Sequence, residues 1–310
     1  MESQLKHIAR LVLLLAIILT SGISFAQNIP PLTNEAIKAF NMRNFVQAEN
    51  KIAEALMHPD ESKNPYTHYT AGFIHKEIYK QLEPENRESK HRILGIRYLK
   101  ECLEMENSGN TADMAISALK FLATSYYNDA LRRTVEITTQ NANEPEILYN
   151  QFRSTMMSAE AQFDFTSYDI QFSKAMGQAH YKLWENDPTL QSEADVCADF
   201  YERVLILDEN DCEAKFNLVI LRYNQGVYRI RSMNTNTDIS EMITMQESAI
   251  RYFYKAMPLA QACFEQCPPA VNYYKGLMFC HRALGNEAEY ERLRLELEEK
   301  IAEGIIKPQK

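Results

Sequence analysis

Apolar residues recur at helical spacing along almost the whole of this 310-residue sequence, and no stretch alternates between apolar and polar residues as a strand does. Helix breakers divide the pattern into segments, such as His58-Pro59-Asp60, Asn107-Ser108-Gly109-Asn110 and Asp187-Pro188. The pattern predicts an all-α fold of about twelve helices, near residues 33–42, 44–57, 65–81, 86–107, 111–138, 143–165, 167–185, 189–207, 211–232, 238–266, 269–284 and 286–303.

Composition supports the helical prediction and excludes some functions. Nine Gly and eleven Pro are few for a sandwich or barrel with many tight turns. The formal net charge is −9, and basic residues form only short clusters such as Arg132–Arg133. A protein that binds duplex nucleic acid usually carries a basic stripe. We therefore expect no nucleic-acid partner.

The first 26 residues have the composition of a secretory signal. Lys6, His7 and Arg10 precede the apolar run Leu11–Leu19, and Ser24-Phe25-Ala26 places small residues where a signal peptidase reads them. Thr20-Ser21-Gly22 ends the run before it reaches the roughly 20 apolar residues of a spanning helix. We expect cleavage and export to the periplasm, most plausibly bacterial, or secretion. The alternative is an uncleaved N-terminal membrane anchor.

This reading divides the chain into four parts. Residues 1–26 are the predicted signal peptide, 27–32 a short linker, 33–303 a helical repeat domain and 304–310 a C-terminal tail. No transmembrane segment is expected once the signal is removed.

One segment carries a recognisable repeat pattern. Residues 214–226, Ala-Lys-Phe-Asn-Leu-Val-Ile-Leu-Arg-Tyr-Asn-Gln-Gly, resemble the first helix of a tetratricopeptide repeat. Leu218, Tyr223 and Gly226 stand where that family places a leucine, an aromatic residue and the turn glycine. Arg222 replaces the usual tyrosine. Weaker copies of the pattern occur at Leu122-Ala123, Met176-Gly177, Ala71-Gly72 and Leu277-Met278.

The second helices repeat a small–large–small rhythm, which lets neighbouring helices approach closely. It is present in Ala48-Ile52-Ala55, Gly95-Leu99-Cys102, Cys197-Tyr201-Val204 and Ala249-Phe253-Ala256. The repeats are longer and less regular than the 34-residue period of the family. The resemblance implies an α-α superhelix of six antiparallel hairpins that binds partners on its concave surface.

The resemblance also selects candidate contact residues. Tyr127, Tyr181 and Tyr223 each stand four residues after the small residue of a first helix, in a slot that faces the concave surface in this family. Phe216 and Ile220 share that face in the fifth hairpin, as do Tyr69 and Phe73 in the second. Tyrosine gives a large rigid contact with a hydroxyl group, which suits a peptide groove. The alternative is that the extended hairpins cover these rings as core.

Some members of the family bind a peptide's terminal carboxylate through Lys and Asn on successive first helices. Lys174, Gln178 and Asn217 occupy the matching places here. Asn272 and Gly276 stand where the next helix would supply two cations, so the clamp is incomplete.

Six cysteines in an exported chain raise the possibility of disulfides. Antiparallel registry around Pro268-Pro269 offsets Cys263 and Cys280 by about 9 Å along the helix axis, whereas a disulfide needs Cα atoms within about 7 Å. Cys197 and Cys212 are further out of register around Asn210. We expect mainly buried thiols, with one disulfide or a metal site as alternatives.

No catalytic motif is present, so we expect no enzyme, cofactor or metal. His68 and His75 lie seven residues apart without a metal-binding motif and are interpreted as packing residues. The run Glu289–Glu299 is interpreted as a solvated capping face. The sequence predicts a scaffold of the cell envelope that binds a protein or peptide partner. A self-associating structural subunit and a small-molecule or glycan binder remain alternatives, and the oligomeric state stays open.

Overall fold

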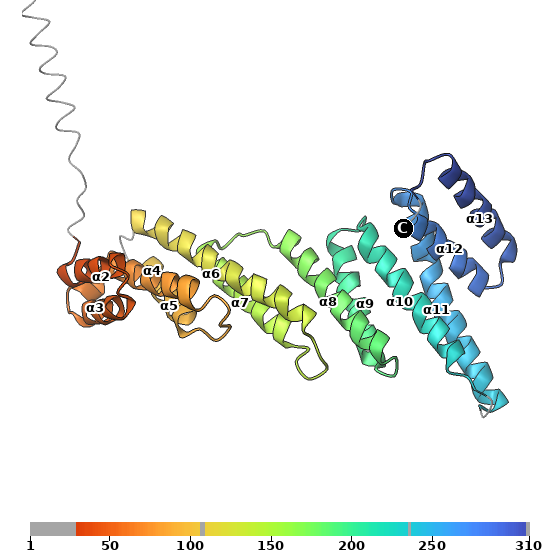
Figure 1. Ribbon diagram of the computed structural model, residues 1–310, viewed down its shortest axis with the longest axis horizontal. Coiled ribbons are helices and arrows are strands. Elements are labelled where there is room, and N and C mark those ends of the chain that lie inside the picture. The colour runs from red at the N-terminus through yellow and green to blue at the C-terminus, as the bar shows by residue number, and fades with distance from the viewer. Residues whose placement is uncertain (1–28, 106–108, 235–236, 308–310) are drawn as a thin grey trace, which may run out of the picture. The chain divides into compact units, whose positions relative to one another are not determined.

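The computed structural model of the chain describes residues 29–105, 109–234 and 237–307. Within these residues it forms α-helices joined by short loops, one 3-10 turn (η1, Glu61–Lys63) and no strand (Figure 1). The helices are α2 (Pro31–Asn41), α3 (Phe45–Met57), α4 (Pro65–Leu82), α5 (Lys90–Glu104), α6 (Asn110–Val135), α7 (Glu144–Ala159), α8 (Thr166–Asn186), α9 (Gln191–Leu207), α10 (Cys212–Arg231), α11 (Ile239–Gln266), α12 (Val271–Ala283) and α13 (Glu287–Ala302). The predicted all-α fold is confirmed.

Most helix boundaries agree with the prediction within a few residues, but two predicted helices are too long. The helix predicted from residue 86 begins at Lys90, because the Ser89 hydroxyl caps it by accepting the Arg92 N–H at 3.1 Å. The helix predicted to reach residue 165 ends at Ala159. The predicted signal peptide lies outside the described residues, as do residues 27 and 28 of the predicted linker. The last two linker residues, Pro31 and Leu32, are instead the first residues of α2, because proline is well accepted in the first turn of a helix.

The chain divides into two compact units. The first unit contains residues 1–125 and 154–161, and the second contains residues 126–153 and 162–310. In each unit the contacts run mainly between consecutive helices, such as α4 with α5 and α10 with α11. Such contacts are consistent with the predicted all-α superhelical class, in which each layer is completed by its neighbours.

In three hairpins, α4–α5, α8–α9 and α10–α11, a large side chain of the second helix packs on a glycine of the first. A Cβ atom added to Gly72 would lie 2.5 Å from the Leu99 side chain. At Gly177 it would lie 2.8 Å from the Tyr201 ring, and at Gly226 it would lie 2.5 Å from the Phe253 ring. Each of these three large residues is the central member of the predicted small–large–small rhythm. The rhythm therefore produces the close approach expected of it.

The Gly226–Phe253 contact also sets the register of α10 against α11. Cys212 stands fourteen positions before Gly226, and Cys267 stands fourteen positions after Phe253. This spacing is close to four helical turns, so the two cysteines come to lie opposite one another. They form a disulfide with a Cα–Cα distance of 5.9 Å. The expectation of mainly buried thiols is therefore wrong for this pair.

The other four cysteines, Cys102, Cys197, Cys263 and Cys280, are buried thiols, as predicted. Burial raises the pKa of Cys102 and Cys263 to about 11, and of Cys197 and Cys280 to about 12. These thiols therefore stay protonated at neutral pH and pack as small apolar groups.

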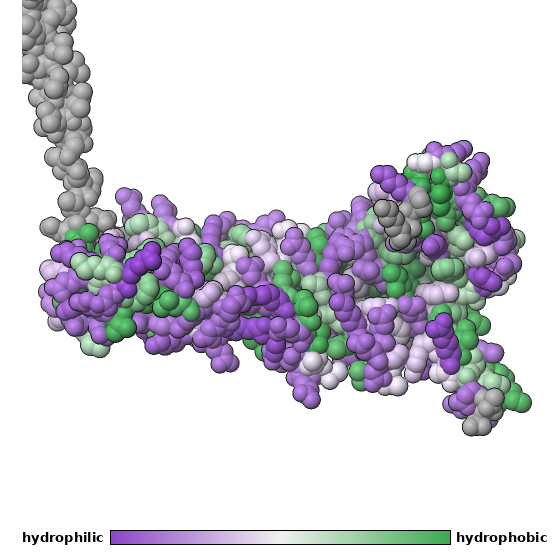
Figure 2. All heavy atoms as spheres, in the orientation of Figure 1, coloured by the Kyte–Doolittle hydropathy of each residue, from purple (hydrophilic) through white to green (hydrophobic). Residues whose placement is uncertain are grey.

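Helix α13 has one apolar and one charged side. Leu293 and Leu297 are buried in a core with Tyr274 and Leu277 of α12. On the other side, Arg292 and Arg294 form ion pairs with glutamates one turn away. Figure 2 shows hydrophilic residues along the outward side of this helix. The predicted solvated face of this helix is thus present.

None of the helices in the described part of the chain combines the length and the apolar character needed to cross a bilayer.

We predict that Gly226→Ala lowers the free energy of unfolding. Its added methyl group would collide with the Phe253 ring, and such overpacking costs ~1–3 kcal/mol, although alanine by itself favours a helix by ~1 kcal/mol. Gly95→Ala is the matched control, because its nearest neighbour is a terminal methyl of Leu122 at 3.2 Å. Urea denaturation should show a smaller loss for the control. Stabilisation by Gly226→Ala would contradict the packing described here.

We predict that the Cys212→Ala/Cys267→Ala double variant is less stable than the parent protein. The disulfide joins residues 55 apart in sequence, and closing a loop of this length stabilises a fold by up to about 4 kcal/mol. Thermal denaturation with and without dithiothreitol checks this. The reductant should lower the Tm of the parent chain and leave that of the double variant unchanged. A parent Tm that is insensitive to reductant would contradict the prediction.

Candidate functional site

A groove of about 430 Å³ lies in the second unit between α8 and α10. We refer to it as the α8–α10 groove. Its lining residues are Lys174, Ala175, Gln178 and Tyr181 of α8, Tyr201 of α9, and Glu213, Asn217 and Ile220 of α10. Apart from the adjacent pair Lys174–Ala175, successive lining residues on each of the two outer helices are three or four apart, so they share one helical face.

The groove brings together several residues that the sequence had selected. Tyr181, Asn217 and Ile220 were predicted partner contacts, and all three line it. Lys174 and Gln178, which match part of the carboxylate clamp of the tetratricopeptide repeats, line it as well. The first helices of two successive hairpins therefore contribute one shared surface.

Lys174 is not available as a cation for a ligand. Its ammonium group lies 2.6 Å from an Asp211 oxygen and 2.8 Å from a Glu213 oxygen. Although burial opposes it, hydrogen bonding to these two carboxylates raises the pKa of Lys174. Two acidic groups on one cation leave this end of the groove with a net negative charge, which would repel a terminal carboxylate.

The amide groups of Gln178 and Asn217 are free. Among the described residues, neither side chain has a hydrogen-bond partner within the protein. Each amide offers two N–H donors and one carbonyl acceptor. The groove therefore contains two solvent-accessible amides that no other protein group engages, beside the apolar side chain of Ile220.

Two tyrosines form the aromatic part of the groove. The Tyr181 hydroxyl accepts a hydrogen bond from the Asn224 amide at 2.7 Å and donates one to Glu185 at 3.3 Å. Burial raises the pKa of Tyr181 to about 12. The Tyr201 ring is fixed by its contact with Gly177. Both rings are thus held in place before any ligand arrives.

The remaining predicted contacts lie elsewhere. Tyr127 is buried among Tyr149, Phe152 and Tyr168, and its hydroxyl donates to Gln171 at 2.9 Å. It belongs to the core, which was the alternative interpretation of these rings.

Phe216 and Tyr223 are half-buried on a different part of α10. The Phe216 ring lies 5.2 Å from that of Tyr273, and the Tyr223 ring lies 5.4 Å from that of Phe253. Tyr69 and Phe73 belong to the first unit, where their rings are 5.9 Å apart. None of these four residues lines the α8–α10 groove.

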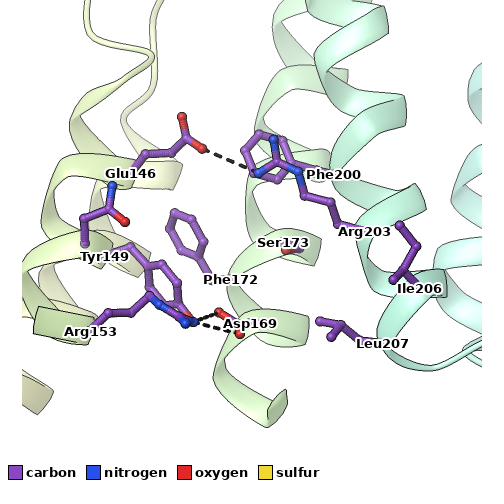
Figure 3. A pocket seen from close by; sticks show the side chains of 11 residues that line it. Glu146, Tyr149, Arg153, Asp169, Phe172, Ser173, Phe200, Arg203, Ile206 and Leu207 are labelled. Atoms are coloured by element: carbon purple, nitrogen blue, oxygen red, sulfur yellow. Dashed lines mark hydrogen bonds and ion pairs between the residues drawn. The ribbon is translucent and has the colours of Figure 1, made fainter. Parts of the chain in front are cut away.

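A second cavity, of about 360 Å³, lies between α7, α8 and α9 (Figure 3). Its aromatic wall includes Phe172 and Tyr149, whose rings stack at 4.1 Å. At one end, Arg153 and the Tyr149 hydroxyl both donate to Asp169, with Arg153 at 2.6 and 2.8 Å. At the other end, Glu146 lies 3.7 Å from Arg203.

The charged side chains of this second cavity are paired with one another, Arg153 with Asp169 and Glu146 with Arg203 (Figure 3). Its uncharged polar side chains, Asn150 and Ser173, have no hydrogen-bond partner among the described residues. Sequence reasoning missed this cavity, because its residues come from three helices and no local motif marks them.

No known protein family matches this chain, and comparison with curated proteins finds no match either. The resemblance to the tetratricopeptide repeats therefore stays a prediction from the residues.

Proposed function

We propose that this chain is a non-enzymatic binding protein, whose α8–α10 groove takes an extended segment of a partner polypeptide. The observation that carries the proposal is the pair of free amides, Gln178 and Asn217, beside Tyr181, Tyr201 and Ile220. An extended peptide presents N–H and C=O groups at intervals, and side-chain amides can pair with both. The aromatic and aliphatic walls would hold an apolar side chain of that peptide.

The charges at the groove narrow the choice of peptide. Because Lys174 is already paired with Asp211 and Glu213, a terminal carboxylate finds no free cation there. The proposed ligand is therefore an internal segment, neutral or basic where it passes these acids. In this respect the groove differs from the carboxylate clamp of the tetratricopeptide repeats.

We further propose that the hairpins are irregular members of the tetratricopeptide class. The support is the close packing of Tyr201 on Gly177 and of Phe253 on Gly226, at positions that the family pattern marks.

The proposed location is the periplasm or the extracellular space. The Cys212–Cys267 disulfide supports it, because disulfides persist in oxidising compartments and are rare in the cytosol. The predicted signal peptide, residues 1–26, is independent support from the sequence.

The test uses the full chain expressed in an export-competent host. Immobilised protein selects peptides from a displayed random library, and fluorescence anisotropy measures the affinity of enriched peptides. We predict that Gln178→Ala/Asn217→Ala weakens binding about tenfold or more, since each lost hydrogen bond is worth ~0.5–1.5 kcal/mol. Ile220→Arg, which fills the groove, should abolish binding.

Gln246→Ala is the matched control, because Gln246 is an exposed amide on α11 outside the groove. Its affinity should equal that of the parent protein. Equal binding by the parent and the double amide variant would overturn the groove assignment. The Ile220→Arg protein serves as the background of the selection. If no peptide is enriched on the parent protein over this background, the groove assignment is overturned as well.

A further inference from the structure

Three metal-ligating side chains meet inside the first unit, far in sequence from the groove. They are Glu49 of α3, His75 of α4 and His91 of α5, and one ligand atom of each lies within 4.8 Å of the others. Sequence reasoning paired His75 with His68 on the same helix. The actual neighbours come from the two helices that flank α4 in the chain.

The distances suit a small metal ion. Glu49 Oε1 lies 2.9 Å from His91 Nε2 and 3.7 Å from His75 Nδ1. Metal–ligand bonds of about 2.1 Å in tetrahedral geometry place two ligand atoms about 3.4 Å apart. The two distances bracket this value, and the ligand atoms of the two histidines lie within 4.8 Å of each other, so rotation of the imidazole rings would bring all three atoms onto one ion.

Stacking holds the imidazole rings in place. The centroid of the His75 ring lies 5.5 Å from that of His91 and 5.6 Å from that of Tyr98, and both pairs are stacked. His91 Nδ1 lies 3.0 Å from Glu83 Oε1 without the geometry of a hydrogen bond. The other Glu83 oxygen accepts a hydrogen bond from the Ser89 hydroxyl at 2.6 Å. A carboxylate on the second nitrogen of a ligating histidine is the usual outer-shell arrangement of protein metal sites.

Burial gives a second, independent reason to expect a ligand. Both histidines are 6% exposed. His75 Nδ1 is buried and has no hydrogen-bond partner among the described residues, which normally costs stability. A coordinated ion would satisfy this nitrogen. Glu49, which is only partly buried, leaves a route from solvent.

We propose that Glu49, His75 and His91 bind one divalent transition-metal ion, with Zn²⁺ as the first candidate. Two imidazoles and one carboxylate form a donor set that zinc accepts, whereas calcium and magnesium prefer oxygen ligands alone. The three protein ligands leave the fourth tetrahedral position for water. The bound ion would join α3, α4 and α5, three successive helices of the first unit.

The test is zinc titration of the chelator-treated full chain, made without a polyhistidine tag, by isothermal calorimetry. The parent protein should bind one Zn²⁺ per chain and gain thermal stability from it. Substituted Co²⁺ should give the visible absorption bands of a tetrahedral site. His75→Asn and His91→Asn should each abolish stoichiometric binding and the Co²⁺ bands.

His68→Asn is the matched control, since His68 is a buried histidine of the same unit with a single carboxylate partner, Glu101, at 3.0 Å. It should bind zinc as the parent does. If the histidine variants fail to fold by circular dichroism, Glu49→Gln replaces them, and it should weaken zinc affinity at least tenfold. No stoichiometric binding by the parent, or unchanged binding by the substituted proteins, would overturn the site and leave a metal-free histidine–carboxylate cluster.

Discussion

The packing of one large side chain on one glycine controls the geometry of three of the hairpins. Because glycine has no Cβ, the large side chain comes to lie almost on the backbone of the facing helix. The contact repeats in three hairpins, with Leu99 on Gly72, Tyr201 on Gly177 and Phe253 on Gly226. It fixes the distance between two helices and also their register. In the α10–α11 hairpin, the same register aligns the two cysteines of the disulfide.

The α8–α10 groove depends on this packing through one residue. Tyr201 is the large side chain that packs on Gly177, and it also lines the groove. The side chains of Gln178 and Asn217 project from the first helices of two successive hairpins, so their separation follows from how those hairpins stack. A binding surface of this kind is set by the scaffold before a ligand arrives, which lowers the entropic cost of binding.

Local features of the structure could be predicted from the sequence, and features that depend on register could not. Helical periodicity and breakers gave nearly all of the helices, since both act within a few residues. The family pattern selected Tyr181, Asn217 and Ile220, which do share a groove, but also Tyr127, which the α7 aromatic residues cover. The disulfide was missed because registry was considered only for Cys197 with Cys212 and for Cys263 with Cys280. A register counted from the α10–α11 turn would also misalign Cys212 and Cys267, since α11 has 28 residues and α10 has 20. The glycine contact would have given the correct register.

Hydrogen exchange of the Gly177→Ala variant, followed by mass spectrometry, tests most directly whether hairpins are held by nearest-neighbour packing on glycine. The displaced Tyr201 ring should increase the amide exchange rates of α8, α9 and the adjoining α10. Helices α12 and α13, which pack on α10 and α11 and on each other, should keep their protection. Unchanged exchange in α8 and α9, or an equal loss of protection in α12 and α13, would contradict the account.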